Sequence, residues 1–214
     1  MSGFVGLALL AVAAGSAAIG AGRKVLERRR ARRTLREQPP LSAAAPEGET
    51  VRVTGIVRVA DETLVAPLSG LTCVVSRSQV SVGAKITSRA VRPRETVHMV
   101  PFLIDRGDEG IVHVEGKHAL LDLPPLHRRD LDSERCIRLL VVHGYSRRDM
   151  RRAVFAETIV AAGDRVSLSG LVMKDVNEAP PGDEERGFRE ALPTTIRIAG
   201  NAEHPLAIGE PIDP

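Results

Sequence analysis

GETVRVTGIV, residues 48–57, is typical of a β-strand, because apolar residues alternate with polar ones along it. GDRVSLSGLV, residues 163–172, repeats it position for position: glycine, acid, any residue, apolar, polar, apolar, polar, glycine, apolar, apolar. The inner glycines, Gly55 and Gly170, fall where the alternation changes phase, and a glycine within a strand often marks a bulge or a sharp bend. We therefore expect two equivalent long strands, each bent at its glycine, that close a small barrel. Two unrelated half-buried strands are the alternative.

The composition indicates a single domain with appendages and an aliphatic core. The chain has 214 residues, 43% of them hydrophobic, but only 2% are aromatic and none is tryptophan. The net charge of +3 is unevenly distributed: residues 1–40 hold eight basic and two acidic residues, and the rest holds 22 basic and 25 acidic ones. A mildly acidic domain without aromatic stacking residues argues against nucleic-acid binding.

The sequence predicts no metal site and no cofactor. Its two cysteines, Cys73 and Cys136, lie far apart, and no CxxC pair or clustered histidines accompany them. A GxGxxG loop and other phosphate-binding loops are also absent. The cysteines are either two buried thiols or a disulfide, and the sequence leaves both readings open.

Residues 3–22 form an uncharged run of 20 residues, long enough for a helix that crosses the roughly 30 Å hydrocarbon core of a bilayer. Basic residues follow the run instead of preceding it, which predicts an uncleaved anchor with the domain on the cytoplasmic side. A disordered tail or a cleaved export signal is the alternative. The membrane-proximal basic residues are Arg23, Lys24, Arg28, Arg29, Arg30, Arg32 and Arg33.

The chain divides into four parts. Residues 1–22 are the anchor, and 23–46 are a basic helix along the membrane surface followed by a Pro/Ala-rich linker. Residues 47–208 are the β domain, and 209–214 are a tail; the segment from Glu203 onward, with its three prolines, is expected to be irregular.

About eight short strands and one helix are expected in the domain. Val97–Asp105 and Gly110–Glu115 read as the two arms of a hairpin. Asp132 or Ser133 caps a helix that Gly144 ends. Closely spaced strands with a helix late in the order favour a sandwich or small barrel, and specifically an OB-like β-barrel.

An ordered set of motifs resembles the GIDE domain, also called BAM for "beside a membrane". The set is Val53-x-Gly55-x-Val57, Glu62-Thr63-Leu64, Ala66-Pro67-Leu68-Ser69-Gly70, Cys73-Val74, Val100-Pro101-Phe102-x-Ile104-Asp105, Gly110-x-Val112-x-Val114, Glu157 and Gly163-Asp164-x-Val166-x-Leu168-x-Gly170. The resemblance covers about residues 48–208. It implies a β domain held at a membrane, as in mitochondrial-anchored ubiquitin ligases and their bacterial relatives.

The resemblance does not extend to ligase activity. In those ligases a carboxy-terminal RING finger carries the activity, whereas no cysteine follows Cys136 here, and the family's second span is missing as well. We expect a single-pass protein of a bacterial inner membrane. The relatives' domain faces the intermembrane space, so a periplasmic domain is the alternative to the cytoplasmic side.

Two functional hypotheses follow. The first is a non-catalytic interaction or scaffold module that binds a protein or lipid partner, with Pro67, Leu68, Ser69 and Gly70 as candidate binding residues. The second is a membrane-tethered hydrolase that uses a His98/His113 hairpin and Asp105. No nucleophile elbow or zinc-protease helix supports the second hypothesis, and no catalytic residue is assigned. The oligomeric state stays open.

Overall fold

The two repeated stretches pair with each other. In the computed structural model, which describes residues 28–83, 94–127, 131–176 and 194–212, they form β1 (Thr50–Val59) and β10 (Arg165–Val176). The strands run antiparallel, and Val53 lies opposite Leu168, its own counterpart in the repeat. The pairing therefore has an approximate two-fold symmetry that the sequence repeat encodes.

The same symmetry extends to the strand ends. The Gly48 backbone N–H donates to the Val172 carbonyl at 2.8 Å, and the equivalent Gly163 N–H donates to the Val57 carbonyl at 2.9 Å. Both glycines adopt a positive φ, 80° and 91°, which favours glycine over other residues. The glycine that opens each copy of the motif is thus a turn residue.

The inner glycines allow the backbone to approach its neighbours closely. A Cβ on Gly55 would lie well inside van der Waals distance of the Asp105 carbonyl oxygen on the adjacent strand. A Cβ on Gly170 would lie 2.7 Å from Ile198 Cγ2 and 2.8 Å from the Ala199 carbonyl oxygen. Each glycine sits where its strand turns towards a second neighbour, as a bent barrel strand requires.

The remaining elements are short. The other strands are β2 (Leu64–Val65), β3 (Thr72–Cys73), β4 (Val75–Val82), β5 (Arg94–Met99), β6 (Phe102–Asp105), β7 (Ile111–Gly116), β8 (Ala119–Asp122), β9 (Ala153–Val160), β11 (Thr194–Gly200) and β12 (Leu206–Gly209). The helices are η1 (Gly107–Glu109), α2 (Ser133–Val142), η3 (Arg147–Arg152) and an amino-terminal helix over residues 28–37.

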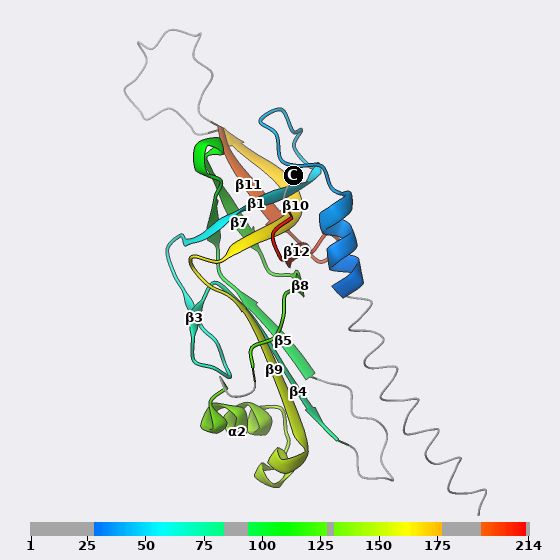
Figure 1. The fold of residues 1–214 in the computed structure, drawn as a ribbon, viewed down its shortest axis with the longest axis vertical. Coiled ribbons are helices and arrows are strands. Elements are labelled where there is room, and N and C mark those ends of the chain that lie inside the picture. Colours follow the sequence, from blue (N-terminus) through cyan, green and yellow to red (C-terminus); the bar gives the residue numbers. More distant parts are fainter. Residues whose placement is uncertain (1–27, 84–93, 128–130, 177–193, 213–214) are drawn as a thin grey trace, which may run out of the picture.

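Five strands close a barrel in the order β1-β6-β7-β11-β10, with β10 returning to β1 (Figure 1). All neighbours are antiparallel except β7 and β11, which are parallel. β12 and β8 continue the sheet from β10. The interior is aliphatic apart from Phe102, with Val53, Val57, Leu168 and Ile198 among its buried residues. The expected mainly β fold and closed barrel are confirmed, and the barrel fits the OB-like architecture.

A second sheet of three strands, in the order β5-β4-β9, runs from the barrel to α2 (Figure 1). The expected hairpin of residues 97–105 with 110–115 is therefore confirmed only for residues 102–105 with 111–114, and its extension back to residue 97 is wrong. β5 pairs with β4, and only β6 pairs with β7, because the chain passes from one sheet to the other at Val100 and Pro101. Pro101 has no N–H to donate, and the Val100 N–H donates to the Val74 carbonyl.

α2 covers the end of the three-stranded sheet distant from the barrel. Its side-chain cap is the Asp132 carboxylate, which accepts from the Arg135 N–H at 2.7 Å, and Gly144 follows with φ 78°. Leu140 packs against Val80 and Val82 of β4. The cap and the terminating glycine are those expected from the sequence.

The domain begins earlier than residue 47. The expected linker lies along β1: the Arg52 N–H donates to the Pro39 carbonyl, the Leu41 N–H donates to the Arg52 carbonyl, each at 2.7 Å, and Leu41 and Ala45 join the barrel core. Prolines in this position read as a linker from sequence, but they are compatible with a strand edge. Residues 38–46 are thus part of the fold.

The carboxy-terminal segment also differs from the expected irregular tail. Leu206–Gly209 is a fully buried strand, β12, which pairs antiparallel with β10 and parallel with β8. The proposed anchor at 3–22 and the loop expected at 175–189 fall largely or wholly outside the described residues. In the described part of the chain, no helix combines the length and apolar character needed to cross a membrane.

Candidate functional site

The first candidate site is the joint between the amino-terminal helix and the edge of the barrel. The helix, residues 28–37, buries Ala31 and Leu35 against Ala207 of β12 and the partly buried Leu120 of β8. Leu35 packs over Gly209, where an added Cβ would lie 2.8 Å from Leu35 Cδ1. The helix that was expected to lie on the membrane surface is therefore packed on the domain.

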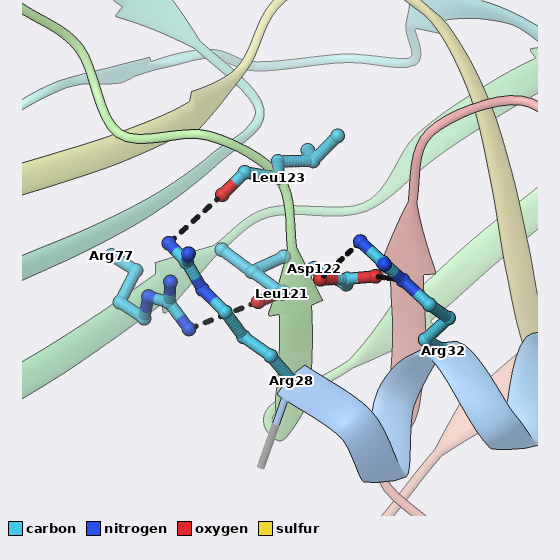
Figure 2. Close-up of polar contacts among 6 residues, drawn as sticks. All are labelled: Arg28, Arg32, Arg77, Leu121, Asp122 and Leu123. Atoms are coloured by element: carbon cyan, nitrogen blue, oxygen red, sulfur yellow. Dashed lines mark hydrogen bonds and ion pairs between the residues drawn. The ribbon is translucent and has the colours of Figure 1, made fainter. Parts of the chain in front are cut away.

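Arginines reinforce this joint (Figure 2). Arg32 Nε donates to Asp122 Oδ2 at 2.7 Å, and its Nη2 donates to Oδ1 at 3.4 Å. Arg28 Nη2 donates to the Leu123 carbonyl at 3.4 Å, while Arg77, from β4, donates to the Leu121 carbonyl at 3.1 Å. Three arginines thus bind three consecutive residues at the end of β8.

The electrostatics of the joint favour the charged pair. The hydrogen bond and the charge of Asp122 raise the pKa of Arg32 above its ordinary value, so the guanidinium stays protonated. The pair is partly exposed, since 57% of the Arg32 side chain is accessible, and exposed ion pairs contribute little alone. Burial of Ala31 and Leu35 therefore supplies most of the stabilisation, and the arginines fix the orientation of the helix.

The other described residues of the expected basic cluster face solvent. Arg29, Arg30 and Arg33 are exposed, and Arg33 forms an ion pair with Glu37 one turn later at 2.7 Å. Arg23 and Lys24 lie outside the described residues. Of the described basic residues of this cluster, two bind the end of β8, namely Arg28 and Arg32. The other three are exposed to solvent.

The second candidate site is the loop that holds the four predicted binding residues. The buried carboxylate of Glu157, on β9, accepts from the Leu68 N–H at 2.8 Å through Oε1 and from the Ser69 N–H at 2.7 Å through Oε2. Ser78 Oγ donates to the same Oε1 at 3.2 Å. A buried carboxylate needs such donors to offset its desolvation. Glu157 therefore clamps the loop to the three-stranded sheet.

The clamp decides how the predicted binding residues are placed. Leu68 is fully buried, whereas Pro67 and Ser69 are half-buried. Gly70 has φ 78° and lies against the Arg135 guanidinium, 3.0 Å from where its Cβ would be. Much of this motif thus has a structural role. Glu157 belongs to the motif set, but no function was expected for it; the signal in the sequence is an acid within the apolar stretch VFAETIV.

Both cysteines are buried thiols that do not pair with each other. Burial first, and the nearby charge of Glu157 second, raise the pKa of the Cys73 thiol to about 11. A thiol with that pKa is protonated at neutral pH and is a poor nucleophile. Cys73 is therefore part of the packing under the loop.

The residues of the hydrolase hypothesis lie on two different sheets. His98, on β5, pairs with Ser76 of β4, whereas His113, on β7, lies between Leu103 and Arg197 in the barrel. The expectation that the two histidines face each other across one hairpin is therefore wrong.

Asp105 is held within its own turn. Its carboxylate accepts from the Gly107 N–H at 2.9 Å and pairs with Arg58 at 3.1 Å. The Gly107 hydrogen bond first, and Arg58 second, lower the pKa of Asp105. Across the described ranges, no three acidic, histidine or cysteine side chains cluster closely enough to hold a metal ion.

Comparison with known proteins gives no assignment: no protein-family model, no curated protein and no solved structure matches this chain.

Proposed function

We propose that the chain is a membrane-anchored, non-catalytic interaction module whose barrel is held in a fixed orientation beside a bilayer. The observation that carries the proposal is the packed joint at residues 28–37. The apolar run of residues 3–22 ends only five residues before this helix. An anchor formed by that run would therefore be coupled to the barrel through a docked helix instead of a flexible linker.

We also propose a GIDE/BAM-like family for the chain, on the ordered motifs of residues 48–208. A closed five-stranded barrel, with α2 inserted in sequence between β7 and β10, fits an OB-like barrel. Fold alone does not define activity, so the proposal rests on the joint and on the residues that it leaves exposed. We propose that the exposed Arg29, Arg30 and Arg33 contact anionic headgroups.

We place the partner-binding surface of the module on the clamped loop and its flanks. Val65 is 59% exposed and Leu71 is 47% exposed, and both border the half-buried Pro67 and Ser69. The Glu157 carboxylate already fixes the loop backbone. Binding of a partner to the apolar rim, Val65 and Leu71, would therefore lose little conformational entropy of the loop. The partner that suits such a rim is a protein with a complementary apolar surface.

Membrane extraction tests the anchor. The full chain, expressed with a carboxy-terminal tag in a bacterium, is expected to stay in the membrane pellet after washing at pH 11, which releases peripheral proteins. A matched variant with Leu9→Arg and Leu10→Arg in the apolar run is expected to be released. Release of the unmodified chain would contradict the anchor.

Protease treatment of intact spheroplasts tests the side of the membrane. The carboxy-terminal tag is expected to survive until detergent is added, because the basic residues lie on the carboxyl side of the apolar run. Digestion of the tag in intact spheroplasts would place the domain in the periplasm, and the search for partners would move to envelope proteins.

A turnover assay separates the module from an enzyme. The purified full chain is expected to hydrolyse no generic ester, phosphoester or peptide. An activity that disappears in Asp105→Asn and in His113→Asn, while the melting curve stays unchanged, would replace the module by a hydrolase.

A further inference from the structure

The end of the three-stranded sheet distant from the barrel exposes both apolar and basic side chains. We define the tip as residues 141–154, which comprise the end of α2, η3 and the start of β9 (Figure 1). Val142 is 75% exposed, Val154 is 66% exposed and Val141 is 50% exposed. The exposed basic residues of the tip are Arg147, Arg148, Arg151 and Arg152.

These valines are not needed for the local core. The tip has its own small cluster, in which Leu140 and Ala153 are buried and Tyr145, Met150 and Phe155 pack around them. The exposed valines lie outside that cluster, at the surface of a segment that is already packed. A group of exposed apolar residues rimmed by polar or charged ones is typical of an interaction site.

The tip is stiff and positively charged. Ser146 and Asp149 form a reciprocal capping box at the start of η3, and Arg152 Nη2 donates to Asp149 Oδ1 at 2.7 Å. Asp149 is the only acidic residue in residues 141–154, and it is engaged in these contacts. Four arginines against one aspartate give this segment a charge of +3, although the chain beyond residue 40 is acidic overall.

The combination points to an anionic lipid surface. Apolar side chains enter the boundary between headgroups and acyl chains, and arginines beside them bind the phosphates of anionic lipids. An acidic protein would satisfy the arginines but would leave three exposed valines without an apolar partner unless it also had a matching apolar patch. The bilayer offers both chemistries at once.

The direction of the amino-terminal helix agrees with this partner. In Figure 1 the amino-terminal end of this helix (blue) points towards the end of the molecule where α2 lies. The apolar run of residues 3–22 lies just upstream of that end in the sequence. An anchor that leaves the domain there would bring the tip, and not the opposite end of the barrel, towards the membrane.

We propose that the tip, residues 141–154, docks onto the anionic leaflet of a bilayer and forms a second membrane contact besides the anchor. The inference deepens the proposed function and rests on it for the orientation. Lipid binding by the tip itself depends only on the exposed valines and arginines. The two contacts would hold the three-stranded sheet along the membrane and leave the loop at residues 66–70 for a protein partner.

A site-specific fluorophore tests the docking. An environment-sensitive label is attached through Val142→Cys in the full chain, with Cys73 and Cys136 replaced by alanine, and the chain is placed in lipid nanodiscs. Discs that contain phosphatidylserine are expected to shift the emission to the blue and to allow quenching by spin-labelled lipids. A label at Ile111→Cys, which is 57% exposed on the barrel, is the matched control and is expected to report water in all discs.

Charge reversal at the tip distinguishes the membrane contact of the tip from that of the anchor. In the Val142-labelled chain, Arg147→Glu with Arg148→Glu is expected to lower quenching of the label by spin-labelled lipids in phosphatidylserine discs about tenfold, whereas Lys117→Glu on the barrel changes it little. A Val142 label that stays in water although the chain co-purifies with anionic discs overturns the docking and leaves the anchor intact. A chain that does not enter discs but binds phosphatidylserine vesicles through the two arginines supports the tip and contradicts the anchor. A chain that does neither overturns both.

Discussion

The barrel and the three-stranded sheet are both built from β-strands, but they differ in what they bury. The barrel encloses aliphatic residues, and its two long strands approach their neighbours so closely at Gly55 and Gly170 that no side chain fits there. β10 of the barrel buries two serines, Ser167 and Ser169, whereas the three-stranded sheet buries a larger polar set that includes a carboxylate. This set is Ser76, Ser78, Gln79, Glu157 and Thr158.

The difference separates the two tasks of the molecule. An aliphatic core packed at close distance gives stability without a chemical role. Buried polar groups cost free energy unless each has a partner, so they are kept where they specify one arrangement. In the three-stranded sheet Glu157 specifies the position of the loop at residues 66–70. We therefore regard the barrel as the support and the second sheet as the part that presents surfaces.

The largest effect is expected from the barrel glycines. Gly55→Val or Gly170→Val would place side-chain atoms against the adjacent backbone, and we expect a loss of about 4 kcal/mol or more in the free energy of unfolding. Because a domain of this size has a total stability of about 5–15 kcal/mol, this loss would remove between about a quarter and four fifths of it, and the melting temperature should fall clearly. Chemical denaturation followed by circular dichroism measures this.

Gly83 provides the matched control, since its added Cβ would meet only the Arg152 carbonyl oxygen at an ordinary 3.7 Å. Gly83→Ala should change the stability by less than about 0.5 kcal/mol. A soluble Gly170→Val protein with an unchanged melting curve would contradict the close approach on which the barrel depends.

The next effect is expected from the clamp. Glu157→Ala removes the acceptor of two backbone N–H groups, and we expect a loss of about 3 kcal/mol together with opening of the loop at residues 66–70. Opening should expose the Cys73 thiol, whose alkylation rate at pH 8 measures the change. The control is Glu62→Ala, because Glu62 is an exposed acidic residue that precedes the loop in the chain. Unaltered Cys73 reactivity in Glu157→Ala would mean that the loop does not need the clamp.

The joint should have a smaller effect on stability. Leu35→Ala removes a buried side chain at the periphery, and we expect a loss of about 2 kcal/mol with the barrel still folded. Hydrogen exchange should then become faster in residues 28–37 while β1 and β10 stay protected. Equal acceleration in the helix and the barrel strands would show that the helix belongs to the same cooperative unit.

The smallest effect is a pH dependence shared by both regions. The Ser146 N–H first, then the Ser146 hydroxyl and Arg152, lower the pKa of Asp149 below its ordinary value of 3.8, and Gly107 and Arg58 do the same for Asp105. A lowered folded-state pKa stabilises the protein above about pH 4, and the contribution is lost as the pH falls through that lowered value. The free energies of unfolding of Asp149→Asn and of Asp105→Asn should each be lower than that of the parent at pH 6. The difference should disappear near pH 2. A difference that stays constant over this range would remove the electrostatic explanation.

The sequence predicted the parts of the fold that depend on local patterns. The repeat of residues 48–57 at 163–172 identified the two strands that close the barrel, because glycine, turn and alternation recur together. Asp132 and Gly144 marked the two ends of α2 because caps are local chemistry. The pairing of strands that are distant in sequence was harder to predict. One alternating pattern runs through Val100 and Pro101, although the strands on either side belong to different sheets.

The sites were harder to predict for a related reason. Arginines after an apolar run suggest headgroup contacts, and nothing local shows that Arg32 meets Asp122, 90 residues away. An acid within a strand suggests a solvent-facing residue, so Glu157 gave no hint of its buried role. The short strand β12 is flanked by Pro205 and Pro211, which made it resemble an irregular tail.

The most direct test of the account is a distance measurement across the joint in a membrane. Spin labels at Arg36→Cys and Ile111→Cys, in the full chain with both native cysteines replaced and inserted into nanodiscs, report the distance between helix and barrel. The account predicts one narrow distance distribution, which Leu35→Asp broadens. A broad distribution in the parent chain, with the barrel folded, would show that the anchor is only a flexible tether and would contradict the fixed orientation.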